Sequence, residues 1–426
     1  MRLAGFALVA YGFAGVALAQ PATTTLTLDA AITRAMDRSA TVVTAMAEQQ
    51  VADAQLQSAS AWANPTLHVE LENVLGKGSN ADFDAAETTV SLAQELPIGG
   101  HRGALRRAAR ASQASASAGL QVAQLSVRRD VTIAYAEAIA ADRLAKIARS
   151  RASIAAETRR AVEQRYAAGL ESELQNSRIA VETSGLQAAA QRAAAGALAA
   201  RRRLAQYWRT DTVVEPLDDV WFDASSGATS GRAAVARGLD RTHPRVQQLQ
   251  LATARAQAEL DAARAQRLSA VEATLGTRRF KDLPSDSNQA FVLGVSVPLP
   301  LWDRNRAGIA SARAELMRME LELEQTGRDL AAQYEFAVAE LGAATLEVQA
   351  LADALPAAES AARLSGLGYD AGRLSSLERL SAERALFDAR EQLEGALARS
   401  ASRAGRPCEP FSTLTSHHLS FHSQLD

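Results

Sequence analysis

The fold is decided at residues 87–97, which read ETTVSLAQELP. Apolar and polar side chains alternate here through Val90 and Leu92, and a period of two is typical of a strand whose faces meet different surroundings. After Pro97, residues 103–167 contain no proline and are rich in helix-forming residues. At 1.5 Å per residue, a helix of roughly 65 residues would reach about 100 Å. The stretch therefore predicts a strand that leads into an exceptionally long helix.

The same arrangement recurs at a single offset of 203 residues. Pro97 is echoed by Pro300, which closes Pro298-Leu299-Pro300. Two further pairs share the offset: Asp37-Arg38-Ser39 with Asp240-Arg241-Thr242, and Tyr166-Ala167-Ala168-Gly169 with Tyr369-Asp370-Ala371-Gly372. Three matches at one offset indicate an internal duplication. We therefore expect a first repeat at residues 20–210, a linker or equatorial segment at 211–230 and a second repeat at 231–400.

Each repeat is predicted to contain a helix, two strands, a long helix and a returning helix. In the first repeat, Asp29 can cap a helix that runs to about Ala63 and is stopped by Pro65. Its other elements are strands at 66–75 and 87–96 around a polar loop at 76–86, and helices at 103–167 and 172–209. The second repeat has strands around 271–275 and 291–297, a loop at 279–288, and helices at 306–370 and 374–400. Pro356 is expected to kink or break the second long helix.

The first long helix carries a coiled-coil-like seam of apolar residues. Its members are Leu120, Val127, Val131, Ala134 and Ala138. Glycines Gly169 and Gly372 follow the two long helices and allow the chain to reverse. The sequence thus predicts two long helical hairpins.

The first 19 residues are predicted to be a secretory signal peptide. Arg2 supplies the positive charge, residues 3–16 are largely apolar, and Ala17-Leu18-Ala19 suits cleavage before Gln20. An N-terminal membrane anchor is the alternative, which the short apolar run disfavours. Beyond residue 20, no stretch approaches the roughly 20 apolar residues of a spanning helix.

Composition excludes several classes of function. The chain has 46 basic and 48 acidic residues, a balance that argues against nucleic-acid binding because a basic face is needed to neutralise phosphates. No nucleophile–base pair, phosphate loop or CxxC motif is present, so we expect no enzyme and no cofactor. The single cysteine, Cys408, cannot form an internal disulfide.

The four predicted strands have the length and alternation of transmembrane β-strands, which need roughly 9–11 residues when tilted. Four strands cannot close a barrel, and open edges are not tolerated in lipid. Two copies would give a barrel filled by side chains, whereas three would leave a lumen. We therefore expect a homotrimer, with a 12-stranded barrel continued by an α-helical tube. The alternative is a soluble β-subdomain on a coiled-coil stalk.

Several segments resemble TolC-family outer-membrane factors, over about residues 25–400. They are Ala63-Asn64-Pro65 with the following strand through Asn73, Gln94 through Arg102, Pro298 through Arg306, and the hairpin tips Tyr166 to Ser172 and Tyr369 to Ser375. In detail they are most similar to the cobalt–zinc–cadmium branch, the outer-membrane components of heavy-metal efflux pumps.

The resemblance implies a mainly α, mixed fold with four transmembrane strands per chain and a periplasmic helical tunnel below a trimeric barrel. It implies a Gram-negative outer membrane and its lipid, a periplasmic adaptor and an inner-membrane RND transporter. The expected function is the exit duct for divalent heavy-metal cations. Alternatives are the same duct for drugs or for type I protein secretion, or a soluble periplasmic coiled-coil scaffold.

The hairpin tips are the candidate functional residues. By resemblance, a periplasmic adaptor would dock on Gly169, Leu170, Ser172, Gly372, Leu374 and Ser375. A plain helix reversal is the simpler interpretation, since glycine adopts positive φ at little cost. Glu171, Glu173 and Asp370 could form an acidic ring at the tunnel entrance, as in cation pores, or could be a solvated face.

Two other groups of residues invite a function. Pro97 and Pro300 mark the barrel-to-helix junctions, and Arg102, Arg106, Arg107 and Arg110 follow the first of them, where they could reach lipid headgroups or lie on a solvated helix face. The tail at 401–426 contains Cys408, His417, His418 and His422. Because this tail loses the helical alanine pattern, we expect it to be disordered or atypical and predict no metal site.

Overall fold

The computed structural model describes residues 25–75, 77–78, 83, 85–225, 243–267, 270–281 and 289–404. The predicted signal peptide at 1–19 and the tail residues Cys408, His417, His418 and His422 lie outside the described residues.

The first half of the chain runs from two consecutive helices through two strands into a long helical hairpin. The elements are α1 (Leu28–Arg38), α2 (Ala40–Ser60), β1 (Thr66–Glu72), β2 (Glu87–Leu96), α3 (His101–Ala167), α4 (Glu173–Ala205), the 3-10 turn η2 (Gln206–Trp208) and α5 (Val220–Ser225). Strand β2 and both long helices of the hairpin lie where the sequence predicts them.

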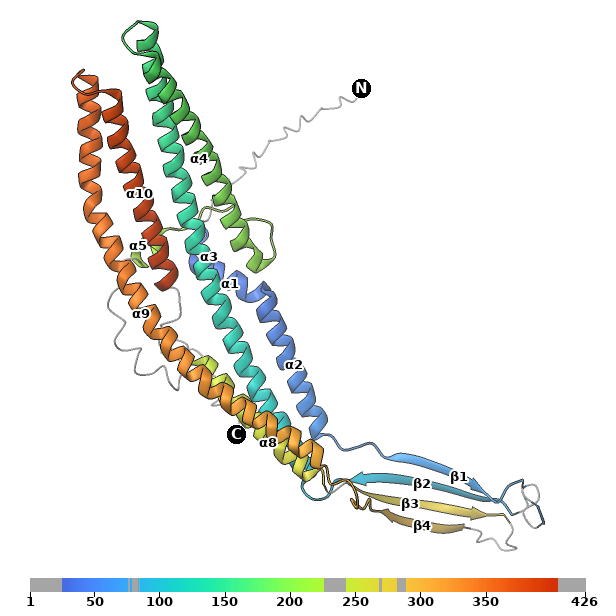
Figure 1. The fold of residues 1–426 in the computed structure, drawn as a ribbon. Helices are drawn as coiled ribbons and strands as arrows, with labels where there is room; N and C mark the ends of the chain where they lie inside the picture. The colour runs from blue at the N-terminus through green and yellow to red at the C-terminus, as the bar shows by residue number, and fades with distance from the viewer. Residues whose placement is uncertain are drawn as a thin grey trace, which may run out of the picture.

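The second half repeats this order. Its elements are α8 (Pro244–Ala265), β3 (Val271–Phe280), β4 (Gln289–Ser296), α9 (Arg306–Asp370) and α10 (Ser376–Ala404). Helices α3 and α9 end 203 residues apart, the offset found in the sequence. Figure 1 shows both hairpins running side by side, with all four strands leaving the opposite end of the helices.

The strands form one antiparallel sheet in the order β1-β2-β3-β4. The register places Val90 beside Val69 and Thr277, and Leu275 beside Leu92 and Leu293, so the large apolar side chains share one face. The opposite face is lined by small and polar residues. There a side chain at Gly276 would lie 2.5 Å from the Cβ of Ser91, so glycine permits the close approach of β2 and β3.

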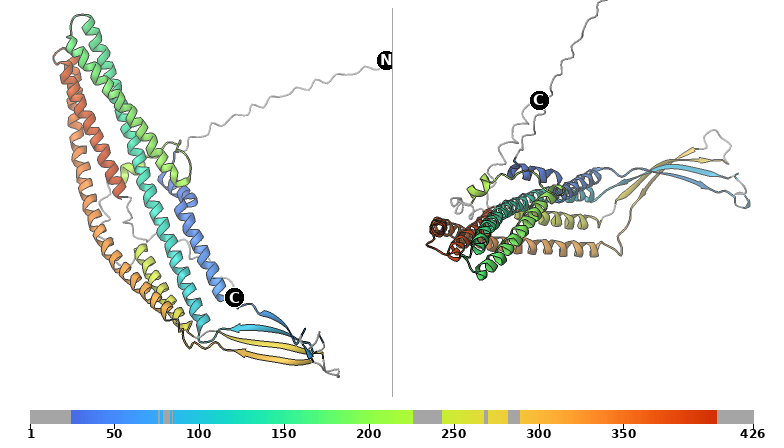
Figure 2. Two further views of the ribbon diagram at one scale, coloured as in Figure 1. Left: turned by 45° about the vertical axis from the view of Figure 1, so that its right-hand side comes forward. Right: turned by 90° about the horizontal axis from the view of Figure 1, so that it is seen from above.

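Helix α3 is the centre of the helical part. It packs against α2 and α8 near the sheet and against α4 and α10 toward the tips, while α9 packs on α8 and α10 (Figures 1 and 2). The order across the molecule is therefore α2-α3-α8-α9 below and α4-α3-α10-α9 above. One edge of the protomer consists of β1, α2 and α4, and the other consists of β4 and α9.

The main core lies at the waist, defined here as the cluster around Leu26, Tyr135, Leu204, Trp208 and Phe222. These side chains come from the chain start, from α3, from the end of α4 and from the segment that follows it. The predicted seam of α3 leads into this core, since Val127, Val131, Ala134 and Ala138 are all buried. Burial of side chains from distant segments fixes the hairpins relative to the helices below.

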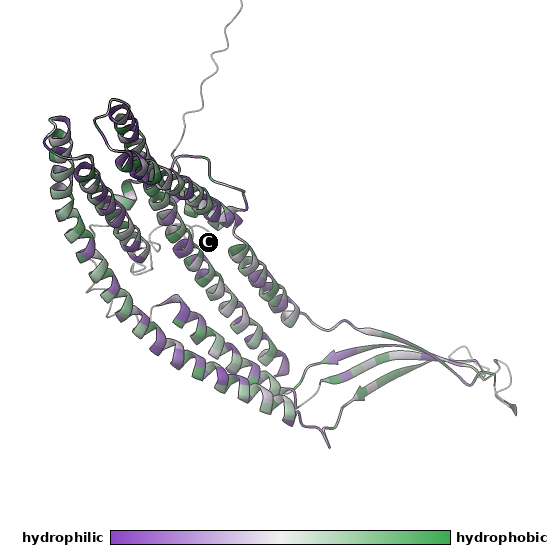
Figure 3. Cartoon of the chain, turned by 45° about the horizontal axis from the view of Figure 1, so that its top comes forward, coloured by the Kyte–Doolittle hydropathy of each residue, from purple (hydrophilic) through white to green (hydrophobic). Residues whose placement is uncertain are grey.

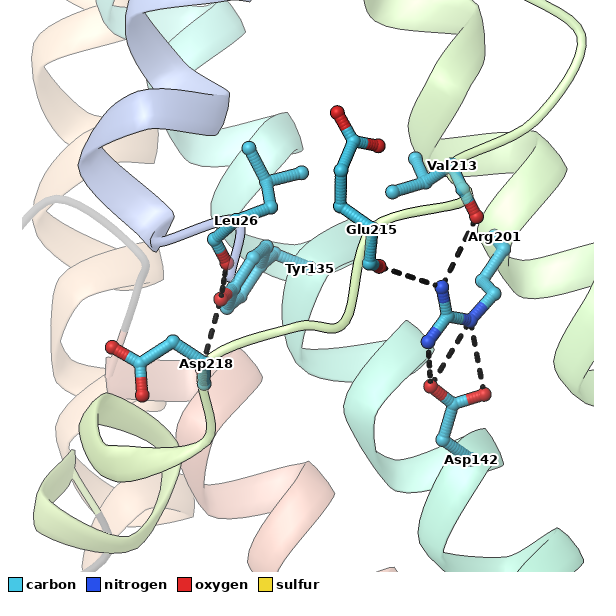
Figure 4. A network of polar contacts seen from close by, with 7 residues as sticks. All are labelled: Leu26, Tyr135, Asp142, Arg201, Val213, Glu215 and Asp218. Carbon is cyan, nitrogen blue, oxygen red and sulfur yellow. Dashed lines mark hydrogen bonds and ion pairs between the residues drawn. The ribbon is translucent and has the colours of Figure 1, made fainter. Parts of the chain in front are cut away.

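Polar contacts tie the waist together (Figure 4). The Tyr135 hydroxyl lies 2.6 Å from the carbonyl oxygen of Leu26 and 2.8 Å from that of Asp218, and burial raises the pKa of this phenol. Arg201 donates to both carboxylate oxygens of Asp142, and its Nη1 donates to the carbonyls of Val213 and Glu215 at 3.1 and 2.9 Å. The segment expected as a linker is thus fastened to α3 and α4 up to Phe222.

The start of the chain corrects one prediction. Thr27, not Asp29, is the N-cap, and its side chain accepts from the Ala30 amide. The predicted single helix is broken at Ser39, whose ψ of 132° is extended, and it ends at Ser60 rather than near Ala63. The break lets α1 join the waist while α2 follows α3. Its counterpart 203 residues later is the start of α8.

The expected break at Pro356 is absent, because α9 runs without interruption from Arg306 to Asp370. Proline removes only one backbone donor here, and α10 holds α9 on both sides of it. The pairs are Arg399 with Glu347 at 2.6 Å and Arg390 with Glu359 at 2.9 Å.

Two further boundaries differ from expectation. Strand β1 ends at Glu72, three residues early, since Asn73 and Leu75 adopt positive φ values of 56°. Helix α10 continues past the predicted end at residue 400 to Ala404, because Ala401 is buried in the core of the waist.

Hydrophobic and hydrophilic residues are interspersed along every long helix (Figure 3). Among the described residues, no helix is both long and apolar enough to cross a membrane.

Candidate functional site

The first tip, residues 168–172, is a tight reversal between α3 and α4. Gly169 has a φ of 74°, and the amide of Leu170 donates to the carbonyl of Arg165 at 2.8 Å. The Ser172 hydroxyl caps α4 by accepting from the Gln175 amide. Because Leu170 is largely exposed, the tip presents an apolar side chain at the end of the hairpin.

The second tip, residues 371–375, has the same geometry. Gly372 has a φ of 69°, and the amides of Arg373 and Leu374 donate to the carbonyl of Gly368. Leu374 folds back over Gly368, where an added Cβ would lie 2.6 Å from its Cδ1. The absence of a side chain at Gly368 therefore lets Leu374 pack closely against the end of α9 and keeps the turn closed.

Ser375 and Glu378 form a capping box at the start of α10. The Glu378 carboxylate accepts from the Ser375 amide at 2.8 Å, and the Ser375 hydroxyl accepts from the Glu378 amide at 3.3 Å. The bond from the Ser375 amide lowers the pKa of Glu378. Both tips are thus rigid, capped turns.

Tyr369 links the two hairpins just below the tips. The guanidinium of Arg379 lies 5.3 Å from its ring centroid, and that of Arg165, from the other hairpin, lies 5.8 Å away. These separations suit cation–π contacts. Neither cation was singled out from the sequence, and the available signal was the duplicated Tyr166 and Tyr369 beside each tip.

The predicted acidic residues do not form one cluster within a protomer. Glu171 lies 3.4 Å from Arg165, and Asp370 lies 3.8 Å from Arg379. Glu173 occupies the first turn of α4, where a carboxylate favours the helix dipole. Two of the three charges are therefore partly compensated by arginine.

A groove of about 600 Å³ lies between the hairpins beside the tips. Ile179 and Val181 of α4 and Leu377 and Leu380 of α10 supply its apolar part, and Arg384 pairs with Glu182 at its rim. The groove offers a concave surface to a partner helix.

The junction is defined here as the segments 61–65, 97–100 and 297–305, which join the sheet to the helices. Pro97 and Pro300 lie in it, as predicted, after β2 and β4. Trp62 and Trp302 are both exposed, and the Arg102 guanidinium lies 4.4 Å from the centroid of the Trp62 ring. The Trp62–Arg102 contact was not anticipated.

The described residues offer surfaces rather than a reaction centre. No group of three His, Cys, Asp or Glu side chains among them could hold a metal ion. The surfaces are the tips with their groove, the two protomer edges, and the apolar face of the sheet.

Both halves of the chain match known proteins. A family model described as outer membrane efflux protein matches residues 31–208 and 239–404. The chain is 29% identical over 397 residues to the cobalt-zinc-cadmium resistance protein CzcC of Cupriavidus metallidurans, spanning 87% of this chain and 86% of that protein. It is 26% identical over 303 residues to the nickel-cobalt-cadmium resistance protein NccC of Alcaligenes xylosoxydans xylosoxydans, spanning 69% and 67%.

A solved structure shares the fold. The CmeC outer membrane channel of Campylobacter jejuni aligns with a TM-score of 0.73 at 14% identity, covering 89% of this chain and 84% of that one.

Proposed function

The chain belongs to the outer membrane efflux protein family, and we propose that three copies close into an outer-membrane exit channel for divalent heavy-metal cations. In this proposal, residues 20–210 and 231–400 are the two repeats of each copy, joined by an equatorial segment at 211–230. A large periplasmic tunnel of helices continues the channel below the membrane.

The observation that carries the proposal is the shared edge order of sheet and helices. At every level, one edge of the protomer is formed by β1, α2 or α4, and the other by β4 or α9. In the described sheet, β1 and β4 each pair on one side only, and an open edge invites pairing with another chain. One rotation that sets β4 beside β1 of the next copy therefore also sets α9 beside its α2 and α4.

Exposed apolar side chains on both edges support a head-to-tail ring. Helix α9 exposes Met317, Leu321, Phe336 and Leu346, while α2 exposes Val43, Met46 and Val51 and α4 exposes Val181 and Leu198. Three copies would supply twelve strands, which leave a lumen, whereas eight strands would be filled by side chains. Rings follow when a heterologous contact closes.

The apolar face of the sheet would then meet lipid. Leu67, Val69, Leu275, Phe291 and Leu293 share that face and are all exposed, and the small and polar face would line the lumen.

The tips would dock a periplasmic adaptor that connects the channel to an inner-membrane RND transporter. Gly169, Leu170, Ser172, Gly372, Leu374 and Ser375 form the rigid ends, and the groove between α4 and α10 lies beside them. Glu171, Glu173 and Asp370 would lie around the tunnel entrance, where three copies bring their acidic groups together.

The metal substrate rests on the relatives, whose names attribute resistance to cobalt, zinc, cadmium and nickel to them. A deletion strain should become sensitive to one or more of these cations and not to hydrophobic drugs. Drug sensitivity alone would favour a drug duct, and a soluble periplasmic protein would favour the scaffold.

Docking is tested by changing the second tip. The double variant Gly372→Val, Leu374→Asp should lose complementation of the deletion strain while oligomer and membrane location stay unchanged. The matched control is Gly366→Ala, in α9 with open space around the glycine. Full resistance in the double variant would contradict docking at this tip.

A further inference from the structure

We propose that the junction is a lipid-binding belt, in which Trp62 and Trp302 anchor in the headgroup region of a membrane leaflet and Arg102 and Arg106 bind the phosphates of its anionic phospholipids. This inference rests on the proposed function, because it requires the sheet to lie in a membrane.

The two tryptophans are exposed far beyond what their size favours. Trp302 is 91% exposed on the segment between β4 and α9, and Trp62 is 58% exposed between α2 and β1. The other two of the chain's four tryptophans, Trp208 and Trp221, pack in the waist. An indole has an apolar body and one polar N–H, which suits the membrane–water interface.

Apolar side chains extend the belt from the tryptophans toward the sheet. Ile98, Leu299 and Leu301 of the junction are also exposed. All four strands begin or end here, at Thr66, Leu96, Val271 and Ser296. A membrane that covers the apolar sheet face must therefore place one of its headgroup layers at the junction.

The arginines supply charge complementary to phosphate. Arg102 and Arg106 lie four residues apart in the first turns of α3, so they share one face of the helix. Arg102 donates to the Ser60 carbonyl and stacks on Trp62, yet the Nε groups of both arginines have no acceptor among the described residues. Protein acceptors thus leave both guanidinium groups unsaturated.

Phosphate is the ligand whose chemistry fits. A guanidinium presents a planar fork of donors that matches phosphate oxygens, and it stacks well on an aromatic ring. Arg107, Arg304 and Arg306 lie close by in the chain and add positive charge around the junction. A zwitterionic or neutral surface would leave this charge without a partner, so we commit to anionic phospholipid.

The anchoring is tested with brominated lipids, which quench indoles at the depth of the bromine. The detergent-extracted protein is reconstituted into vesicles of phosphatidylethanolamine and phosphatidylglycerol that carry bromine near the headgroup end of the acyl chains. Variants that keep only Trp302 or only Trp208 are compared. Trp302 should be quenched strongly and Trp208 hardly at all. Equal, weak quenching of both would overturn the anchor.

A second variant separates this inference from the proposed function. Phe291, 84% exposed on the apolar sheet face, is changed to Trp in a protein whose four tryptophans are Phe. Quenching of that indole without quenching of Trp302 would refute the belt and leave the membrane-embedded sheet intact. If neither is quenched, the sheet is not in the bilayer and the proposed function itself fails.

If the tryptophan-free protein does not fold, the single changes Trp302→Phe and Trp208→Phe replace it. The first should remove most of the quenchable emission, and the second should not. The opposite pattern would overturn the proposal.

Phosphate binding is tested with Trp62 as reporter, since Arg102 lies on its ring. Brominated phosphatidylglycerol should quench Trp62 more than brominated phosphatidylcholine, by about fivefold in effective local concentration if one cation contributes about 1 kcal/mol. Arg102→Gln and Arg106→Gln should each reduce this preference, and Arg102→Lys should retain part of it. Arg328→Gln, a change far along α9 from the junction, should leave it unchanged. No preference in the unchanged protein, or an unaltered one in the glutamine variants, would refute phosphate binding.

Discussion

At the waist, segments far apart in the chain are held by buried side chains and by polar contacts within one protomer, whereas the tips, edges and sheet turn apolar side chains outward. Tyr135 and Phe222 are fully buried, while Leu170 at the first tip and Phe291 on the sheet are exposed. The difference indicates which parts a single chain completes and which await a partner. Mutations at the waist should affect stability, and mutations at the ends should affect assembly and docking.

The largest expected effect is at Arg201, the residue that fastens the equatorial segment. Arg201→Met leaves Asp142 without its bidentate partner and two backbone carbonyls without a donor, at a cost of about 3 kcal/mol. Chemical unfolding in detergent, followed by circular dichroism, measures this cost.

Arg203 provides the matched control two residues away. Its pair with Glu137 at 2.8 Å is mostly exposed, at 62% and 41%, so Arg203→Met should cost less than about 1 kcal/mol. Equal costs for the two variants would mean that the waist is not held as described.

The Tyr135 hydroxyl is the next test. Tyr135→Phe keeps the ring in the core but leaves the carbonyls of Leu26 and Asp218 without their donor, and we expect a loss of about 2 kcal/mol. Tyr166→Phe, in the more exposed duplicate of Tyr369, should change the unfolding free energy little. Similar losses in both would blur the contrast between waist and tip.

A smaller effect is expected at the tip glycine. Gly372→Ala places a side chain at a φ of 69°, which costs about 1 kcal/mol, although no atom lies within 4 Å of the added Cβ. Gly366→Ala, at a helical position with equal space, should be neutral or stabilising. Indistinguishable melting temperatures for the two would contradict the left-handed turn.

The smallest effect concerns the pH dependence of the second tip. The pKa of Glu378 is lowered from its ordinary value of 4.5 by the Ser375 amide, so the cap stabilises the folded state above pH 4.5 and is lost as pH falls through the folded pKa. Glu378→Gln should therefore flatten the dependence of local hydrogen exchange at residues 375–378 between neutral and acidic pH. An unchanged dependence in this variant would exclude the carboxylate as its cause.

Local patterns predicted the elements, because strand alternation and proline-free helices are encoded by neighbouring residues. Strand β2 and the two reversal glycines were located from such patterns. The break at Ser39 and the continuity through Pro356 depend on packing against other elements, which outweighs local propensity. The duplication carried a missed signal, since Ser39 matches Thr242, just before α8 begins.

The site could be predicted less fully. The tip turns follow from glycine and serine chemistry, yet the contacts of Tyr369 with Arg165 and Arg379 join residues from separate hairpins. Likewise, the stack of Arg102 on Trp62 depends on how α2 and α3 align. Such contacts are set by tertiary geometry and leave no periodic pattern.

The oligomeric mass of the protein extracted by detergent from the isolated outer membrane tests the central claim most directly. Light scattering of the purified complex, corrected for bound detergent, should give three times the mass of one mature chain. A monomer, or a protein recovered from the soluble periplasm, would contradict the channel.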